Sequence, residues 1–95
     1  EKYAKLLFVV GLDNEKYIDN LNLAENLVSK MRLINPNITR GIVKKSGKGV
    51  NGIYNQDLNT NMILIELGGQ YNQIEELSNT IEILSNVIIN YLKEV

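Results

Sequence analysis

Apolar residues fall into five segments, and their spacing predicts which of these are strands and which are helices. Residues 5–10 and 62–67 are short apolar runs and residues 38–43 form a weaker one, so each is predicted to be a strand. Residues 15–34 and 74–95 carry apolar side chains three and four positions apart, the spacing of a helix with one buried face.

The order of these segments is strand, helix, strand, loop, strand and helix, with the loop over residues 44–61. This order predicts an α/β fold, with a parallel or mostly parallel sheet flanked by helices. The chain opens directly inside a strand pattern at Tyr3. We therefore expect residues 1–95 to be the C-terminal part of a single larger domain, without that domain's upstream strands.

The run Met62-Ile63-Leu64-Ile65-Glu66-Leu67-Gly68-Gly69 is apolar at consecutive positions and ends in one carboxylate and two glycines. Such a strand is typically buried on both faces in a parallel sheet, and ligands bind at the carboxyl edge of such sheets. Glu66 is therefore a candidate catalytic acid/base. The alternative is a structural carboxylate, paired with a cation or accepting backbone N–H groups from the Gly68-Gly69 turn.

Composition restricts the chemistry that the chain can perform. Histidine and cysteine are both absent, so the chain alone supplies neither an ordinary zinc site nor a Ser-His-Asp or Cys-His arrangement. A net charge of −1 gives no basic face for nucleic acid, and no apolar run approaches the roughly 18 residues of a membrane span. Any chemistry of this chain must use carboxylates or groups from elsewhere.

Two loop patterns imitate known sites without meeting their requirements. Residues 47–52 match the dinucleotide pattern G-x-G-x-x-G, but the following residues favour turns and not the helix that would hold a pyrophosphate. Residues 57–61 imitate half of a calcium loop, yet Met62 and Gly68 occupy the positions that need glycine and glutamate. Both are better explained as polar turns.

The last helix has a possible start and an apolar stripe. Asn72 and Glu75 have the spacing of a capping box. The stripe could form a coiled-coil seam, but further apolar residues make it too broad and favour a helix packed on a sheet. The stripe is Ile74, Leu77, Ile81, Leu84, Ile88, Tyr91 and Val95, widened by Ile83, Val87, Ile89 and Leu92.

Five segments carry a resemblance to a known family. Residues 64–68 (Leu-Ile-Glu-Leu-Gly) resemble the terminal motif of zinc-dependent N-acetylmuramoyl-L-alanine amidases, and residues 39–43 (Thr-Arg-Gly-Ile-Val) resemble the strand that precedes it. Residues 4–14, 52–58 and 66–69 together resemble the C-terminal portion of the stage II sporulation protein P family. The resemblance runs over essentially the whole chain in the same order.

This resemblance implies a peptidoglycan hydrolase of sporulation and engulfment. It implies cleavage of the amide between N-acetylmuramic acid and L-alanine, and of peptide cross-links as well. It further implies action outside the cytoplasm, anchorage through an upstream membrane segment, and other engulfment-machinery proteins as partners. No nucleic acid is expected.

The resemblance also assigns site residues. It implies a zinc ion in the intact domain, held by histidines and a glutamate in the upstream half, so this chain alone is expected to bind no zinc and to be inactive. Glu66 is the implied acid/base. Asn55, Gln56 and Asp57 are predicted either to contact stem peptide or glycan or to bond their own turn, and Arg40 to be structural or adjacent to substrate.

Two other function classes remain open. One is a non-catalytic α/β interaction module, in which the last helix docks a partner and Glu66 forms a structural ion pair. The other is a metal-independent carboxylate hydrolase, which needs a second acid near Glu66. The sequence offers only Asp57 and Glu75 or Glu76 for that role, none at a compelling spacing.

Overall fold

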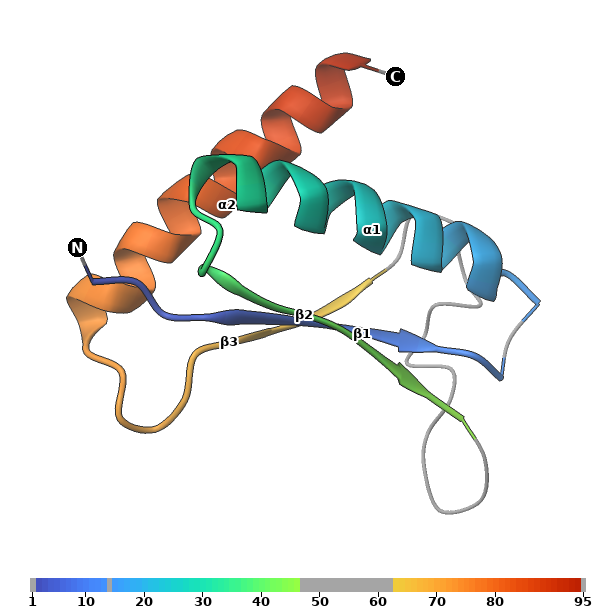
Figure 1. Cartoon of the computed structure of the whole chain (residues 1–95), viewed down its shortest axis with the longest axis horizontal. Coiled ribbons are helices and arrows are strands. Elements are labelled where there is room, and N and C mark those ends of the chain that lie inside the picture. Colours follow the sequence, from blue (N-terminus) through green and yellow to red (C-terminus); the bar gives the residue numbers. More distant parts are fainter. Residues whose placement is uncertain (1, 14, 47–62, 95) are drawn as a thin grey trace.

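The computed structural model describes residues 2–13, 15–46 and 63–94, which form a three-stranded sheet and two helices (Figure 1). The elements are β1 (Leu6–Gly11), α1 (Tyr17–Ile34), β2 (Thr39–Lys45), β3 (Leu64–Leu67) and α2 (Ile74–Glu94). The sheet order is β2-β1-β3. The predicted α/β class and the order of the elements are confirmed.

The two strand pairs run in different directions, so the sheet is mixed. β1 and β2 are parallel and are joined through α1, whereas β3 is antiparallel to β1. Glu66 pairs with Leu7, near the beginning of β1. The prediction that Glu66 lies at an edge formed by the carboxyl ends of parallel strands is wrong, because β3 runs antiparallel to β1, the strand it pairs with.

Both helices lie on the same face of the sheet (Figure 1). The expectation that β3 is buried on both faces is therefore also wrong, and three of its four residues are only partly buried while Glu66 is exposed. We call the face opposite α1 and α2 the far face. By strand alternation its described residues include Leu7, Val9, Leu64 and Glu66.

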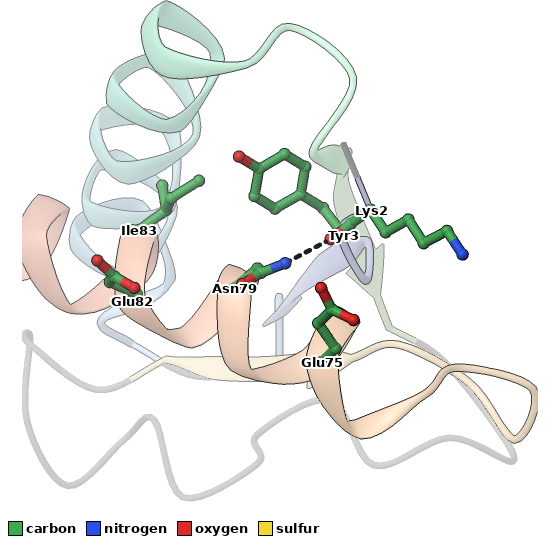
Figure 2. A pocket seen from close by; sticks show the side chains of 6 residues that line it. All are labelled: Lys2, Tyr3, Glu75, Asn79, Glu82 and Ile83. Atoms are coloured by element: carbon green, nitrogen blue, oxygen red, sulfur yellow. Dashed lines mark hydrogen bonds between the residues drawn. The ribbon is translucent and has the colours of Figure 1, made fainter.

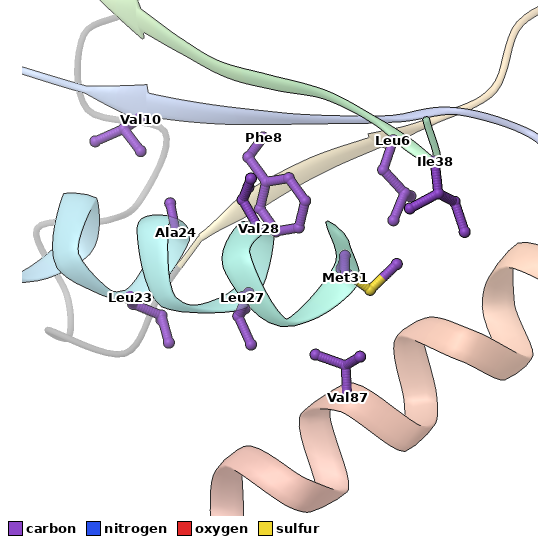
Figure 3. Packing of buried hydrophobic residues seen from close by; sticks show 10 residues of the cluster. All are labelled: Leu6, Phe8, Val10, Leu23, Ala24, Leu27, Val28, Met31, Ile38 and Val87. Atoms are coloured by element: carbon purple, nitrogen blue, oxygen red, sulfur yellow. The ribbon is translucent and has the colours of Figure 1, made fainter. Parts of the chain in front are cut away.

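The hydrophobic core lies between the sheet and α1, with α2 packed beside α1. Alternate residues of β1 point into it, and Figure 3 shows Val87 of α2 pointing toward α1. Burying each large apolar side chain stabilises the fold by about 1.5–3 kcal/mol. The buried cluster comprises Leu6, Phe8, Val10, Leu23, Ala24, Leu27, Val28, Met31, Ile38 and Val87.

β2 contains an irregularity beside the middle of β1. The pairing shifts between Leu6, which faces Thr39, and Phe8, which faces Ile42, so β2 has one extra residue there. Gly41 has φ +92, a conformation that L side chains rarely adopt, and its N–H donates to the Thr39 hydroxyl at 2.9 Å. This bulge sets which side chains of β2 reach each face.

The end of α1 agrees with the prediction from the sequence, whereas the start of α2 differs from it. α1 ends at Ile34, and Asn35 before the proline is extended (φ −148, ψ 109), as predicted. α2 does not use the predicted Asn72–Glu75 box. Its box is formed one residue later, where Glu76 Oε1 accepts the Gln73 N–H at 2.8 Å, and Asn72 Nδ2 donates to the same oxygen at 3.2 Å.

The apolar stripe of α2 is divided between two sides of the helix. Thr80 and Val87 are buried, and Leu77, Leu84 and Tyr91 are partly buried. An outer stripe remains exposed, formed by Ile74 (85%), Ile81 (47%), Ile88 (37%) and Leu92 (60%). Packing on the body of the fold thus uses only part of the apolar surface. No helix in the described part of the chain is long and apolar enough to cross a membrane.

Candidate functional site

Glu66 is the principal candidate, and the pairing of β3 fixes the direction of its side chain. Leu67 and Ile65 pair with Leu6 and Phe8, which point into the core. Since neighbouring residues of a strand point to opposite faces, Glu66 projects from the far face beside Leu7. Glu66 is exposed there, although the residues before and after it, Ile65 and Leu67, pack against the core.

Neither structural role considered for Glu66, an ion pair or the acceptance of turn N–H groups, is found among the described residues. Its carboxylate forms no ion pair or hydrogen bond with any of them. The turn amides have other acceptors, because Gly68 N–H donates to the Lys5 carbonyl at 2.8 Å and Gly69 N–H to Asn72 Oδ1 at 2.7 Å. Within the described part, the Glu66 carboxylate is uncommitted.

Hydrogen bonds from three segments hold the end of β3 near Glu66. Gly68 has φ +69 and leads the chain out of the strand. The buried Thr80 hydroxyl donates to the Ala4 carbonyl at 2.6 Å, and Ala4 N–H donates to the Glu76 carbonyl at 3.2 Å. The segment before β1, the turn after β3 and the first half of α2 therefore form one hydrogen-bonded unit.

Arg40 lies on the same face as Glu66. Thr39 pairs with Leu6 on the side of the helices and is buried, so Arg40, the next residue, projects from the far face. Two strand spacings separate Arg40 from Glu66, which puts their Cα atoms about 10 Å apart. Arg40 is exposed, and its guanidinium forms no ion pair with the described residues. The structure thus brings two predicted site residues to one surface.

A third charged residue on this surface was not singled out from the sequence. Lys5 lies between Ala4 and Leu6, which are buried, and it is exposed. Its carbonyl accepts the Gly68 N–H, so it lies diagonally across from Glu66 at a Cα distance of about 7–8 Å. The only sequence signal was its alternation with buried neighbours, and that signal does not reveal which strand lies alongside.

The remaining predicted contacts cannot be placed. Asn55, Gln56 and Asp57 lie outside the described residues. Glu75 and Glu76, the other acids considered as partners for Glu66, lie in the first turn of α2. The Glu76 carboxylate is engaged with Gln73 and Asn72, and these hydrogen bonds, the backbone one foremost, lower its pKa below 4.5.

The chain's own residues do not fit a zinc centre. Imidazole and thiolate, the usual zinc ligands, are absent from the whole sequence. Among the residues that the structure describes, no group of three or more aspartates or glutamates is placed to hold a metal ion. Imidazole or thiolate ligands for a zinc ion would have to come from outside these 95 residues.

A separate hollow of about 310 Å³ lies between the start of the chain and α2 (Figure 2). Asn79 spans its floor by donating to the Lys2 carbonyl at 3.0 Å. Glu75, considered above as a second acid, lines it, whereas Glu66 and Arg40 do not. The lining residues are Lys2, Tyr3, Glu75, Asn79, Glu82 and Ile83. Its mixed charges and lack of a metal-binding group give it no chemistry comparable to that of the far face.

Comparison with known proteins identifies the family. Residues 1–89 match the family model of stage II sporulation protein P. The chain is also 34% identical over 87 residues to stage II sporulation protein P of Bacillus subtilis (strain 168), which covers 92% of the chain. The chain belongs to the stage II sporulation protein P family.

The family assignment confirms the resemblance seen in the sequence, and it places the chain in sporulation. The match includes Lys5, Arg40 and Glu66, so the far face lies within the region shared with the stage II sporulation protein P family. The chain spans about a fifth of the Bacillus subtilis relative, or 22% of its length. No solved structure matches the chain significantly.

Proposed function

We propose that this chain supplies the acid/base of a peptidoglycan hydrolase, acting as part of a longer protein. The bond cleaved is the amide between N-acetylmuramic acid and L-alanine, with peptide cross-links as further substrates. The observation that supports this proposal is the carboxylate of Glu66, which is exposed on the far face of a matched family region and has no partner among the described residues. The isolated chain is expected to be inactive.

The chemistry assigned to Glu66 is proton transfer. Its carboxylate accepts a proton from the attacking water as the water oxygen bonds to the amide carbonyl carbon. The amide C–N bond then breaks, and the proton passes to the departing alanine amine. Because Glu66 itself is exposed, a polymeric substrate can reach its carboxylate. The hydrogen-bonded unit around Gly68 and Thr80 fixes the strand end that carries it.

A zinc ion remains part of the proposal for the intact protein only. Because the chain lacks histidine and cysteine, its ligands would come from other parts of that protein.

Substrate contact and location are further parts of the proposal. Arg40 is assigned to the substrate surface because it shares the far face with Glu66. Asn55, Gln56 and Asp57 are proposed to contact stem peptide or glycan. Action outside the cytoplasm, anchorage by an upstream segment, and contact with other engulfment-machinery proteins are proposed from the family assignment.

The test uses a hybrid protein, in which this chain replaces the matching segment of the Bacillus subtilis relative. Peptide release from purified peptidoglycan is measured with zinc present, for the hybrid and for its Glu66→Gln variant. We expect release from the hybrid and a loss of at least about a hundredfold in the variant, in the range of general acid–base contributions.

A matched control is Glu82→Gln, which removes another exposed glutamate that forms no ion pair or hydrogen bond with the described residues. It should leave the rate unchanged. Circular dichroism of both variants checks that the fold is retained. A folded Glu66→Gln variant with normal peptide release would contradict the proposal.

The outer stripe of α2 favours a second candidate, the non-catalytic interaction module. Ile74, Ile81, Ile88 and Leu92 leave a row of apolar side chains exposed, more than a solvated helix face needs. The two candidates differ in a sporulation assay with the hybrid. An interaction module requires spore formation to survive Glu66→Gln and to fail with Ile81→Gln and Ile88→Gln combined, whereas the hydrolase proposal requires Glu66→Gln to fail.

A further inference from the structure

Lys5 and Arg40 are cations on the far face near Glu66 that have no carboxylate partner among the described residues. Lys5 lies diagonally across from Glu66 on β1, and Arg40 lies two strands away on β2. Neither side chain forms an ion pair or hydrogen bond with the described residues. Leu7 of β1 pairs with Glu66 of β3 on one side. On its other side it faces the β2 bulge that contains Arg40.

The arrangement is set by pairing across all three strands. The Gly41 bulge inserts one residue in β2, so that Arg40 and Gly41 together oppose Leu7. The Gly68 N–H bond to the Lys5 carbonyl extends the β1–β3 pairing to the residue before β1. A row formed by Arg40, Leu7 and Glu66 therefore crosses the sheet, with Lys5 beside it.

We propose that Lys5 and Arg40 together bind a carboxylate on the peptide side of the scissile amide, and so hold that amide next to Glu66. The inference rests on the proposed function, since it takes a muramoyl peptide as substrate. An arginine guanidinium binds carboxylate through two parallel N–H donors, and a lysine ammonium adds a mobile point charge. The partly buried Leu7 provides an apolar floor between Arg40 and Glu66.

The geometry explains why this face recognises an anion although its catalytic group is itself anionic. Glu66 alone would repel a peptide carboxylate. Two positive charges within about 10 Å of it give the described surface residues Lys5, Arg40 and Glu66 a positive balance. Neither cation forms an ion pair with Glu66, so its carboxylate is not engaged by either of them.

Binding can be measured without turnover, which separates this inference from the catalytic proposal. The hybrid protein carrying Glu66→Gln is titrated calorimetrically with N-acetylmuramoyl-L-alanyl-D-glutamine, whose free carboxylate lies beyond the alanine as in a stem peptide, and with its C-terminal amide, in which that group is neutral. We expect the acid to bind at least about tenfold more tightly than the amide, the low end for charge-assisted hydrogen bonds.

Lys5→Gln and Arg40→Gln should each bring this ratio toward one. Lys44→Gln is the matched control, because Lys44 is an exposed cation on the same strand as Arg40 that pairs with the core-facing Val10. It should keep the ratio. Equal binding of acid and amide by the parent, no binding of either, or a ratio that persists in the Lys5 or the Arg40 variant would overturn the proposal.

Failure of the catalytic proposal would appear in the peptide-release assay and not in the acid-to-amide binding ratio. If Glu66→Gln hybrids release peptide normally while the acid-to-amide ratio depends on Lys5 and Arg40, the binding site stands and Glu66 is not its acid/base. If Glu66→Gln abolishes release while the ratio is one, the acid/base stands and the carboxylate site does not.

Discussion

Gly68 has the backbone conformation and the surroundings that make it difficult to replace. Its φ of +69 is unfavourable for L side chains, and a Cβ there would lie 2.6 Å from Asn72 Oδ1 and 2.9 Å from Leu77 Cδ2. Asn72 is held by Gly69 and Glu76, so it cannot move away freely. We expect Gly68→Ala to lower the free energy of unfolding by about 2–4 kcal/mol, from left-handed strain and overpacking.

Urea unfolding followed by circular dichroism measures this loss, and the neighbouring glycine provides the control. A Cβ on Gly69 would meet nothing within 4 Å. Gly69→Ala should therefore change the unfolding midpoint much less than Gly68→Ala. Equal effects of the two substitutions would show that the turn after β3 is not built as described.

At the same residue scale, the sequence indicated which carboxylate to consider but not its surroundings. Glu66 stood out because it interrupts an apolar run before two glycines. Its exposure could not be foreseen, since consecutive apolar residues suggested cover on both faces, whereas α1 and α2 share one face. Lys5 was missed because its relation to Glu66 exists only across strands.

The start of α2 is an element whose stability depends on one ionised side chain. The Gln73 N–H bond, and then the Asn72 side chain, lower the Glu76 pKa below 4.5, with Lys2 adding to this and partial desolvation opposing it. A carboxyl with a lowered folded-state pKa adds stability that is fully present above its unfolded pKa. That stability is lost as the pH falls below 4.5 through the folded-state value.

We therefore expect Glu76→Gln to flatten the acid limb of the stability profile. Urea unfolding from about pH 5 to about pH 3 should show a smaller loss of stability for the variant than for the parent chain. The control is Glu82→Gln later in α2, whose carboxylate forms no hydrogen bond with the described residues. A parent and a Glu76→Gln variant with parallel profiles would contradict the assigned box.

Element ends were predictable where one residue decides the local backbone. Pro36 forces the extended conformation at Asn35 and so ends α1 after Ile34. The capping box of α2 lies one residue later than predicted. Asn72 accepts the Gly69 N–H instead, and Gln73 takes the position before the helix. Two adjacent polar candidates cannot be ranked by spacing alone, since the decision depends on the turn that precedes them.

At the scale of the whole molecule, the unpredicted feature is the direction of β3. Apolar periodicity indicates which residues are buried but not the direction in which a strand runs. The long predicted loop over residues 44–61 is compatible with either direction. The direction matters for function, because it sets whether Glu66 lies beside the first or the last part of β1. Antiparallel pairing places it near Lys5 and Leu7.

Engineered disulfides decide the direction directly, because the chain has no cysteine of its own. Phe8 pairs with Ile65, so antiparallel strands place Leu7 opposite Glu66, whereas parallel strands with that pair retained would place Val9 there. Directly opposed residues have Cα atoms about 4.5–5.5 Å apart, within the range of a disulfide, and diagonal ones exceed it. We expect rapid oxidation of the Leu7→Cys, Glu66→Cys pair in the hybrid protein, measured by loss of free thiol, and little of the Val9→Cys, Glu66→Cys pair. The reverse order would move Glu66 away from Lys5 and remove the basis for a shared carboxylate site.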